Sequence, residues 1–137
     1  MINEFRGKYY FLSNFFTVPV TYEGITYANN EAAFQAAKTL SQKIRQEFAN
    51  LPPNEAKKKG RAVTLRENWD VIKYDIMYNI VLAKFTQNPE LKAKLLATGN
   101  ELLEEGNNWG DKIWGTVNGV GHNNLGKILM RIRDELR

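Results

Sequence analysis

The longest regular pattern in the chain is an apolar stripe that runs from about Leu65 to Phe85. Its apolar residues recur at steps of three and four, the spacing that gathers side chains on one face of an α-helix. They are Trp69, Ile72, Ile76, Ile80 and Ala83. The pattern therefore predicts a long helix at the centre of the core.

Shorter elements are expected on both sides of this helix. Two β-prone runs, Val18 to Tyr22 and Ile25 to Tyr27, flank Glu23-Gly24 and predict a tight hairpin in an N-terminal β part. A helix is expected to start at Asn29 or Asn30, which can cap its first turn, and to reach Lys38. Further helices are expected at Gln42 to Asn50, at Glu55 to Lys59 after an Asn54 cap and before Gly60, at Pro89 to Ala97 before Thr98-Gly99, and at Leu125 to Leu136.

Composition limits the class of protein. With 137 residues, 43% of them apolar and 25% charged, the chain is expected to fold as one domain over residues 1–137. The expected fold class is α+β, predominantly helical, with a small N-terminal β-hairpin. No apolar run approaches the ~20 residues of a membrane-spanning helix, and no signal-peptide pattern opens the chain, so a cytoplasmic protein without a membrane partner is expected.

The residue types also exclude some chemistry. The absence of cysteine removes disulfides, thiolate metal sites and thiol nucleophiles. His122 is the single histidine and has no partners at metal-ligand spacing, so we expect neither a metal nor another cofactor. The net charge of +4 indicates phosphorylated partners only weakly, because basic runs such as Lys57 to Arg61 are usually solvated helix faces.

Two regions carry candidate functional residues. Glu31 and Lys38 lie seven residues apart on one expected helix and can line one pocket, although a solvated helix with an exposed acid and base has the same spacing. The segment from Glu104 to Asn124 is rich in glycine and asparagine and carries Trp109 and Trp114. Such a loop between helices is a better candidate for function than for core.

The order of several motifs resembles the YbiA-like, or NADAR, superfamily over almost the whole chain. The most specific are the run Phe11 to Phe15, the run Glu31 to Lys38, and Gly121, Asn123 and Leu125-Gly126 at the close. Other matching positions are Phe5-Arg6-Gly7, Pro19, Tyr22-Glu23-Gly24, Tyr27, Gly60-Arg61, Trp69, Met77, Lys84-Phe85, Leu95 to Gly99, Glu105, Asp111, Trp114-Gly115 and Leu129 to Arg133.

This resemblance implies a mostly helical fold and N-glycosidase activity on a phosphorylated ribosyl compound. The implied substrates are phosphoribosylamino-pyrimidine intermediates of riboflavin synthesis in one branch and ADP-ribosylated guanine, free or in DNA, in another. Glu31, Trp69 and Asp111 match the family's acid, tryptophan and second acid. The variable loop around Asn107 to Gly110 leaves the accepted base open, and the oligomeric state is not specified.

The chemistry of the reaction assigns roles to these positions. Cleavage of a ribosyl C–N bond builds positive charge on the sugar, so Glu31 is expected to stabilise it or orient water, with Asp111 as acid or base. Trp69 is expected to stack on the base. Lys38 either holds a phosphate or attacks the anomeric carbon. The further expected substrate-binding residues are Asn14, Asn123, Gly7, Trp114 and Gly115, with Arg6, Arg61 and Arg133 as phosphate ligands.

Two other functions remain open at this point. A module that binds ADP-ribose or NAD without cleavage would need the same pocket, but the presence of both acids argues against it. A nucleic-acid-binding protein is less favoured, because the tryptophans lie near acids and glycines and not along a basic stripe. The glycosidase hypothesis requires Glu31, Trp69 and Asp111 to meet around one cavity.

Overall fold

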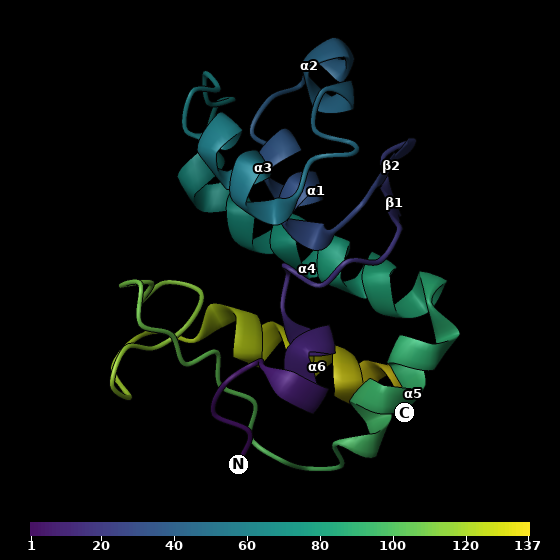
Figure 1. The fold of residues 1–137 in the computed structure, drawn as a ribbon, viewed down its shortest axis with the longest axis vertical. Helices are drawn as coiled ribbons and strands as arrows, with labels where there is room; N and C mark the ends of the chain where they lie inside the picture. The colour runs from purple at the N-terminus through teal and green to yellow at the C-terminus, as the bar shows by residue number, and fades with distance from the viewer. The chain divides into compact units, whose positions relative to one another are not determined.

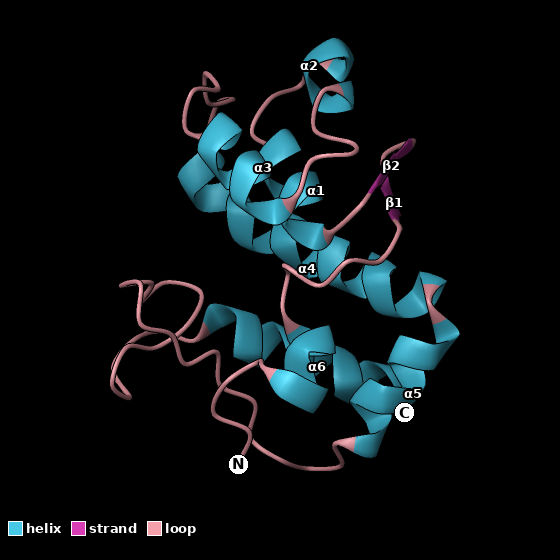
Figure 2. Cartoon of the chain, in the orientation of Figure 1, coloured by secondary structure: helices cyan, strands magenta, loops and turns pink.

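A computed structural model describes all residues from 1 to 137, and the chain divides into two compact units. The hairpin unit consists of residues 14–87, and the terminal unit joins residues 1–13 to residues 88–137. Helices make up most of the regular structure, and the only sheet has two strands (Figures 1 and 2). The α+β, predominantly helical class is therefore confirmed.

The hairpin unit begins with the predicted β-hairpin. Strand β1 (Val20–Tyr22) pairs antiparallel with β2 (Ile25–Tyr27), and Val20 lies opposite Tyr27. Glu23 and Gly24 both have positive φ, at 49° and 87°, as the tightest hairpin turns require. The remaining elements are α1 (Asn30–Ala36), α2 (Gln42–Gln46), α3 (Pro53–Gly60) and α4 (Trp69–Gln87).

Helix α1 lies at the centre of the hairpin unit. It contacts α3, α4 and both strands, and every one of its residues is buried. The side chain of Asn29 accepts a hydrogen bond from the N–H of Ala32 at 2.8 Å, which confirms the predicted cap. Because α1 has no solvent-facing side, the alternative of a solvated amphipathic helix is wrong.

The terminal unit has its own core. It contains a 3₁₀ helix η1 (Gly7–Leu12), α5 (Pro89–Ala97) and α6 (Asn124–Leu136), and a long irregular segment connects α5 to α6. Its core residues include Ile2, Phe5, Leu91, Leu95, Leu103, Leu125, Leu129 and Ile132. The ends of α5 are as predicted, with proline in the first turn and Gly99 at a φ of 64° after the last.

Several predicted boundaries are wrong for local reasons. The N-terminal region is not uniformly β, because residues 7–12 form η1. Helix α4 starts at Trp69 and not near Leu65, because Asn68 has a φ of 60° and ends any helix there. Helix α3 begins at Pro53 without an Asn54 cap, and α2 stops at Gln46. No helix combines the length and apolar character that crossing a bilayer would require.

Candidate functional site

Glu31 is a buried carboxylate at the start of α1. Its backbone N–H donates to the carbonyl oxygen of Asn14 at 3.0 Å, and its side chain keeps only 8% of its surface exposed. The Oε1 atom accepts a hydrogen bond from Nε2 of Gln35 at 2.8 Å. A carboxylate withdrawn from water is costly unless such donors compensate it, so this arrangement is typical of a functional acid.

Lys38 lies within electrostatic range of one carboxylate, Glu31, and of two further cations, Arg61 and Lys73. Lys38 follows the end of α1, and its Nζ donates to the carbonyl oxygen of Gly60 at 3.3 Å. Burial lowers the pKa of Lys38, the charge of Glu31 opposes this, and Arg61 and Lys73 lower the pKa further. One carboxylate and two further cations thus act on the charge of Lys38, a combination that suits an anionic sugar.

Lys73 did not emerge from the motifs of the sequence. Its Nζ lies 3.3 Å from Asp70 of the same helix, which gives it the appearance of an ordinary surface ion pair. The one signal in the sequence is its position four residues after Trp69, which places both on the same side of α4.

Asn14 connects α1 to α4 through its side chain. Its Oδ1 accepts from the side chain of Asn30 at 3.3 Å, and its Nδ2 donates to the sulfur of Met77 at 3.5 Å. The side chain is buried. Asn14 therefore has a structural role at the start of α1, and its predicted hydrogen bond to substrate stays a prediction.

Trp69 packs against α1. Its ring centroid lies 5.2 Å from that of Phe34 at an interplanar angle of 47°, and only 6% of the residue is exposed. A tryptophan in this position contributes to the core. Stacking on a substrate base stays a prediction and is restricted to the part of the ring that Phe34 does not cover.

Asp111 organises a turn in the terminal unit. Its Oδ1 accepts from the backbone N–H groups of Ile113 at 3.0 Å and Trp114 at 2.9 Å. The side chain of Asn107 binds the backbone of the same residue twice: its Oδ1 accepts from the N–H of Asp111, and its Nδ2 donates to the Asp111 carbonyl oxygen. Asp111 thus caps a turn through one oxygen, which leaves Oδ2 as the atom for any chemistry.

Gly115 and Asn123 have structural explanations. A Cβ at Gly115 would lie 2.1 Å from the carbonyl oxygen of Glu105, so only glycine fits there. Asn123 accepts from the N–H of Glu105 and donates to the carbonyl oxygen of Leu103, both at 2.9 Å. The close approach at Gly115 and the two hydrogen bonds of Asn123 explain both motif positions without a ligand. Trp114, which precedes Gly115, is half-buried.

The expected phosphate ligands differ in their surroundings. Arg61 is exposed at the end of α3, and Arg6 is exposed before η1, whose first residue is Gly7 at a φ of 57°. Arg6 and Glu104 line an open hollow of about 490 Å³ in the terminal unit.

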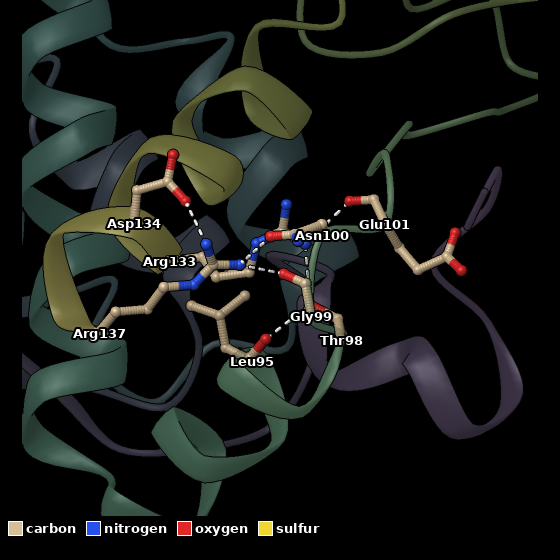
Figure 3. Close-up of polar contacts among 8 residues, drawn as sticks. All are labelled: Leu95, Thr98, Gly99, Asn100, Glu101, Arg133, Asp134 and Arg137. Atoms are coloured by element: carbon tan, nitrogen blue, oxygen red, sulfur yellow. Dashed lines mark hydrogen bonds and ion pairs between the residues drawn. The ribbon is translucent and has the colours of Figure 1, made fainter.

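Arg133, by contrast, is buried. Its Nη1 donates to Oγ1 of Thr98 at 3.0 Å and to the carbonyl oxygen of Glu101 at 2.8 Å (Figure 3). This side chain ties α6 to the turn after α5. A guanidinium with these partners is a poor phosphate ligand, so we correct that expectation.

The predicted site residues fall into two groups. Glu31, Lys38, Trp69, Asn14 and Arg61 belong to the hairpin unit. The terminal unit contains Asp111, Trp114, Gly115, Asn123, Arg6 and Gly7. The meeting of Glu31, Trp69 and Asp111 around one cavity stays a prediction.

No three His, Asp or Glu side chains are grouped as metal ligands would be, and His122 is an exposed loop residue.

A protein family and several known proteins match this chain over most of its length. Residues 3–137 match the NADAR domain family. N-glycosidase YbiA of Escherichia coli (strain K12) is 40% identical over 129 residues, which cover 90% of this chain and 79% of that protein. A riboflavin biosynthesis protein of Vibrio vulnificus is 33% identical over 136 residues, which cover 93% of this chain and 35% of that protein. The NMR structure of the E. coli protein YbiA matches with a TM-score of 0.84 and 36% identity, over 99% of this chain and 86% of that one.

Proposed function

The chain belongs to the NADAR domain family, and from this premise we propose that it hydrolyses the N-glycosidic bond of a phosphorylated ribosyl compound. The resemblance predicted from the motifs is thereby confirmed. Relatives that cover most of the chain are named N-glycosidases, so the chain is a hydrolase of N-glycosyl compounds. The identity of the substrate and the roles of individual residues are the parts that we propose.

The observation that carries the proposal is the buried carboxylate of Glu31, held by Gln35 and close enough to Lys38 to act on the charge of that amine. When the C1′–N bond breaks, its electron pair leaves with the base nitrogen, which takes a proton, and the oxygen of water bonds to C1′. Positive charge develops on the ribosyl ring during this step. A carboxylate fixed in place near the ring stabilises that charge or orients the water.

Lys38 and the two cations that act on it, Arg61 and Lys73, support a phosphorylated substrate. Arg61 is exposed, and Lys38 and Lys73 are half-buried, so their charges can meet an anion that approaches from solvent. Guanidinium and ammonium groups bind phosphate oxygens through charge-assisted hydrogen bonds. We assign Arg61 and Lys73 to the phosphate.

Lys38 has a second role open to it. Burial lowers its pKa, which increases the fraction of neutral amine able to act as a nucleophile. Its lone pair would bond to C1′ as the base leaves, and opening of the ring at its oxygen would give an iminium ion that water hydrolyses. Borohydride added during turnover should then leave a mass adduct on Lys38, and the absence of an adduct would restrict Lys38 to phosphate binding.

Asp111 and Trp69 complete the proposal from the family resemblance. Asp111 is the proposed acid or base for the departing nitrogen, with Oδ2 as the reactive atom because Oδ1 caps a turn. Trp69 is the proposed contact for the base. Substitution of each residue tests its part separately from that of Glu31.

The substrate class is tested by direct detection of released base. Purified protein is incubated with phosphoribosylamino-pyrimidines and, separately, with DNA that carries ADP-ribosylated guanine, and the products are analysed by mass spectrometry. The name of the Vibrio vulnificus relative motivates the first panel. Release of base from one panel by wild type but not by Glu31→Gln supports the proposal, and silence of wild type on both panels contradicts it.

A further inference from the structure

Gln35 lies one turn after Glu31 on α1 and is buried. Its Nε2 donates to Glu31 Oε1 at 2.8 Å, whereas its own Oε1 is buried and has no hydrogen-bond partner. An ionised carboxylate can only accept hydrogen bonds, so the amide must turn its nitrogen toward Glu31 and its oxygen away. The Gln35 amide therefore makes its hydrogen bond to Glu31 while its own oxygen goes without one.

The unpaired oxygen of Gln35 faces Gly60, the last residue of α3. A Cβ added at Gly60 would lie 2.0 Å from Gln35 Oε1 and 2.7 Å from its Cδ. Gly60 has no positive φ, so its backbone does not require glycine. Glycine is unfavourable inside a helix, and the close approach of the Gln35 amide gives the reason for its presence here.

Gly60 also fixes a second side chain of the proposed site. Its carbonyl oxygen accepts from Lys38 Nζ at 3.3 Å. The end of α3 thus contacts Gln35 through the bare Cα of Gly60 and Lys38 through its carbonyl group. Both side chains follow Glu31 within seven residues along the chain.

We propose that Gln35 and Gly60 act together as positioning residues, in which Gly60 leaves the space that lets the Gln35 amide hold the Glu31 carboxylate in one orientation. This inference rests on the proposed function of Glu31. It assigns no contact with substrate to either residue.

The first test is kinetic. Gln35→Met keeps the length and apolar volume of the side chain and removes the donor, and Gln46→Met, at an exposed position of α2, is the matched control. We expect kcat for base release to fall by roughly 10- to 100-fold with KM nearly unchanged, since misplacement of a catalytic group by about 1 Å has costs of this size. The Tm should fall only slightly, because the loss of the donor to the buried Glu31 carboxylate is offset in part by the removal of the unpaired buried oxygen.

The second test is a double-mutant cycle on Tm. Gly60→Ala should lower Tm when Gln35 is present, because the new methyl group displaces the amide. In the Gln35→Ala background the amide is gone and only the Cβ of residue 35 remains, 3.1 Å from the new methyl group, so the same change should lower Tm much less. An equal effect of Gly60→Ala in both backgrounds would show that the two residues do not interact.

The outcomes separate this inference from the proposed function. If wild type releases base, Glu31→Gln does not, and Gln35→Met retains the wild-type kcat, the positioning role is wrong while the function of Glu31 stands. A loss of activity in Gln35→Met that matches an equal loss of folded protein would also overturn it. If wild type is silent on both substrate panels, the proposed function and this inference fail together.

Discussion

Replacement of Lys84 by methionine is expected to stabilise the protein at neutral pH. Lys84 lies on α4 with 1% of its surface exposed, and burial lowers its pKa from 10.5 to about 7. Methionine keeps a similar length and flexibility without the amine. The substitution therefore removes the cost of placing an ionisable group in the interior.

The size of the effect follows from this pKa. The pKa of Lys84 is 10.5 in the unfolded chain and about 7 in the folded protein. This difference lowers the free energy of unfolding by about 4–5 kcal/mol at low pH and by about 4 kcal/mol at pH 7. The rings of Phe16 and Phe85 lie 5.7 and 5.3 Å from Nζ. Their attraction for the cation is worth ~0.5–2 kcal/mol and offsets part of the cost. Loss of the other contacts of the amine offsets a further part, so we expect Lys84→Met to gain roughly 1–4 kcal/mol at pH 7.

The gain should depend on pH in one direction. Between pH 7 and 10.5 the unfolded chain binds a proton at Lys84 that the folded protein releases, so wild-type stability rises with pH across this range. The advantage of the variant should therefore shrink and vanish near pH 10.5. Burial raises the pKa of Tyr22 to about 12, and because both proteins contain Tyr22 its effect cancels in their difference.

Urea unfolding of both proteins at a series of pH values from 7 to 10 measures this difference. A variant that is less stable than wild type at pH 7 would refute the reasoning. So would a difference between the two proteins that stays constant from pH 7 to pH 10.

Three further substitutions test other parts of the account. Asp111→Asn keeps an oxygen for the N–H groups of Ile113 and Trp114, so Tm should hold while base release falls; full activity would exclude Asp111 as the acid or base. Asn123→Ala removes two bonds to the backbone and should lower the free energy of unfolding by roughly 2–3 kcal/mol in urea titrations, and an unchanged value would contradict its structural role. Arg61→Ala should raise KM for a phosphorylated substrate with little change in kcat or Tm, and a KM equal to that of wild type would remove Arg61 from the phosphate site.

The parts of the fold that were predictable from the sequence are those with local signals. The β-hairpin carries turn residues, α5 carries a first-turn proline and a stop at Gly99, and α6 carries a periodic apolar face, so the sequence predicts all three within a few residues. The start of α4 was not predictable, because periodicity continues through Leu65 while the left-handed backbone of Asn68 ends it. The 3₁₀ helix η1 has no periodic signature in the sequence.

The sequence predicts which residues belong to the candidate site, but not their burial or their contacts. Spacing predicts Glu31 and Lys38 on one helix, but α1 ends at Ala36, before Lys38, and only the structure shows that every residue of α1 is buried. Asn123 reaches backbone groups 18 and 20 residues away, and Gln35 meets Gly60 across two helices. No rule of local sequence contains contacts over such distances.

The most direct test of the central claim is the steady-state kcat of Glu31→Gln. Glutamine keeps the shape of the side chain and an oxygen that can accept from Gln35, but it carries no charge. The account predicts a fall in kcat of about 10²- to 10⁴-fold, the usual contribution of a positioned acid or base, with Tm nearly unchanged. A folded Glu31→Gln protein that releases base at the wild-type rate would contradict it.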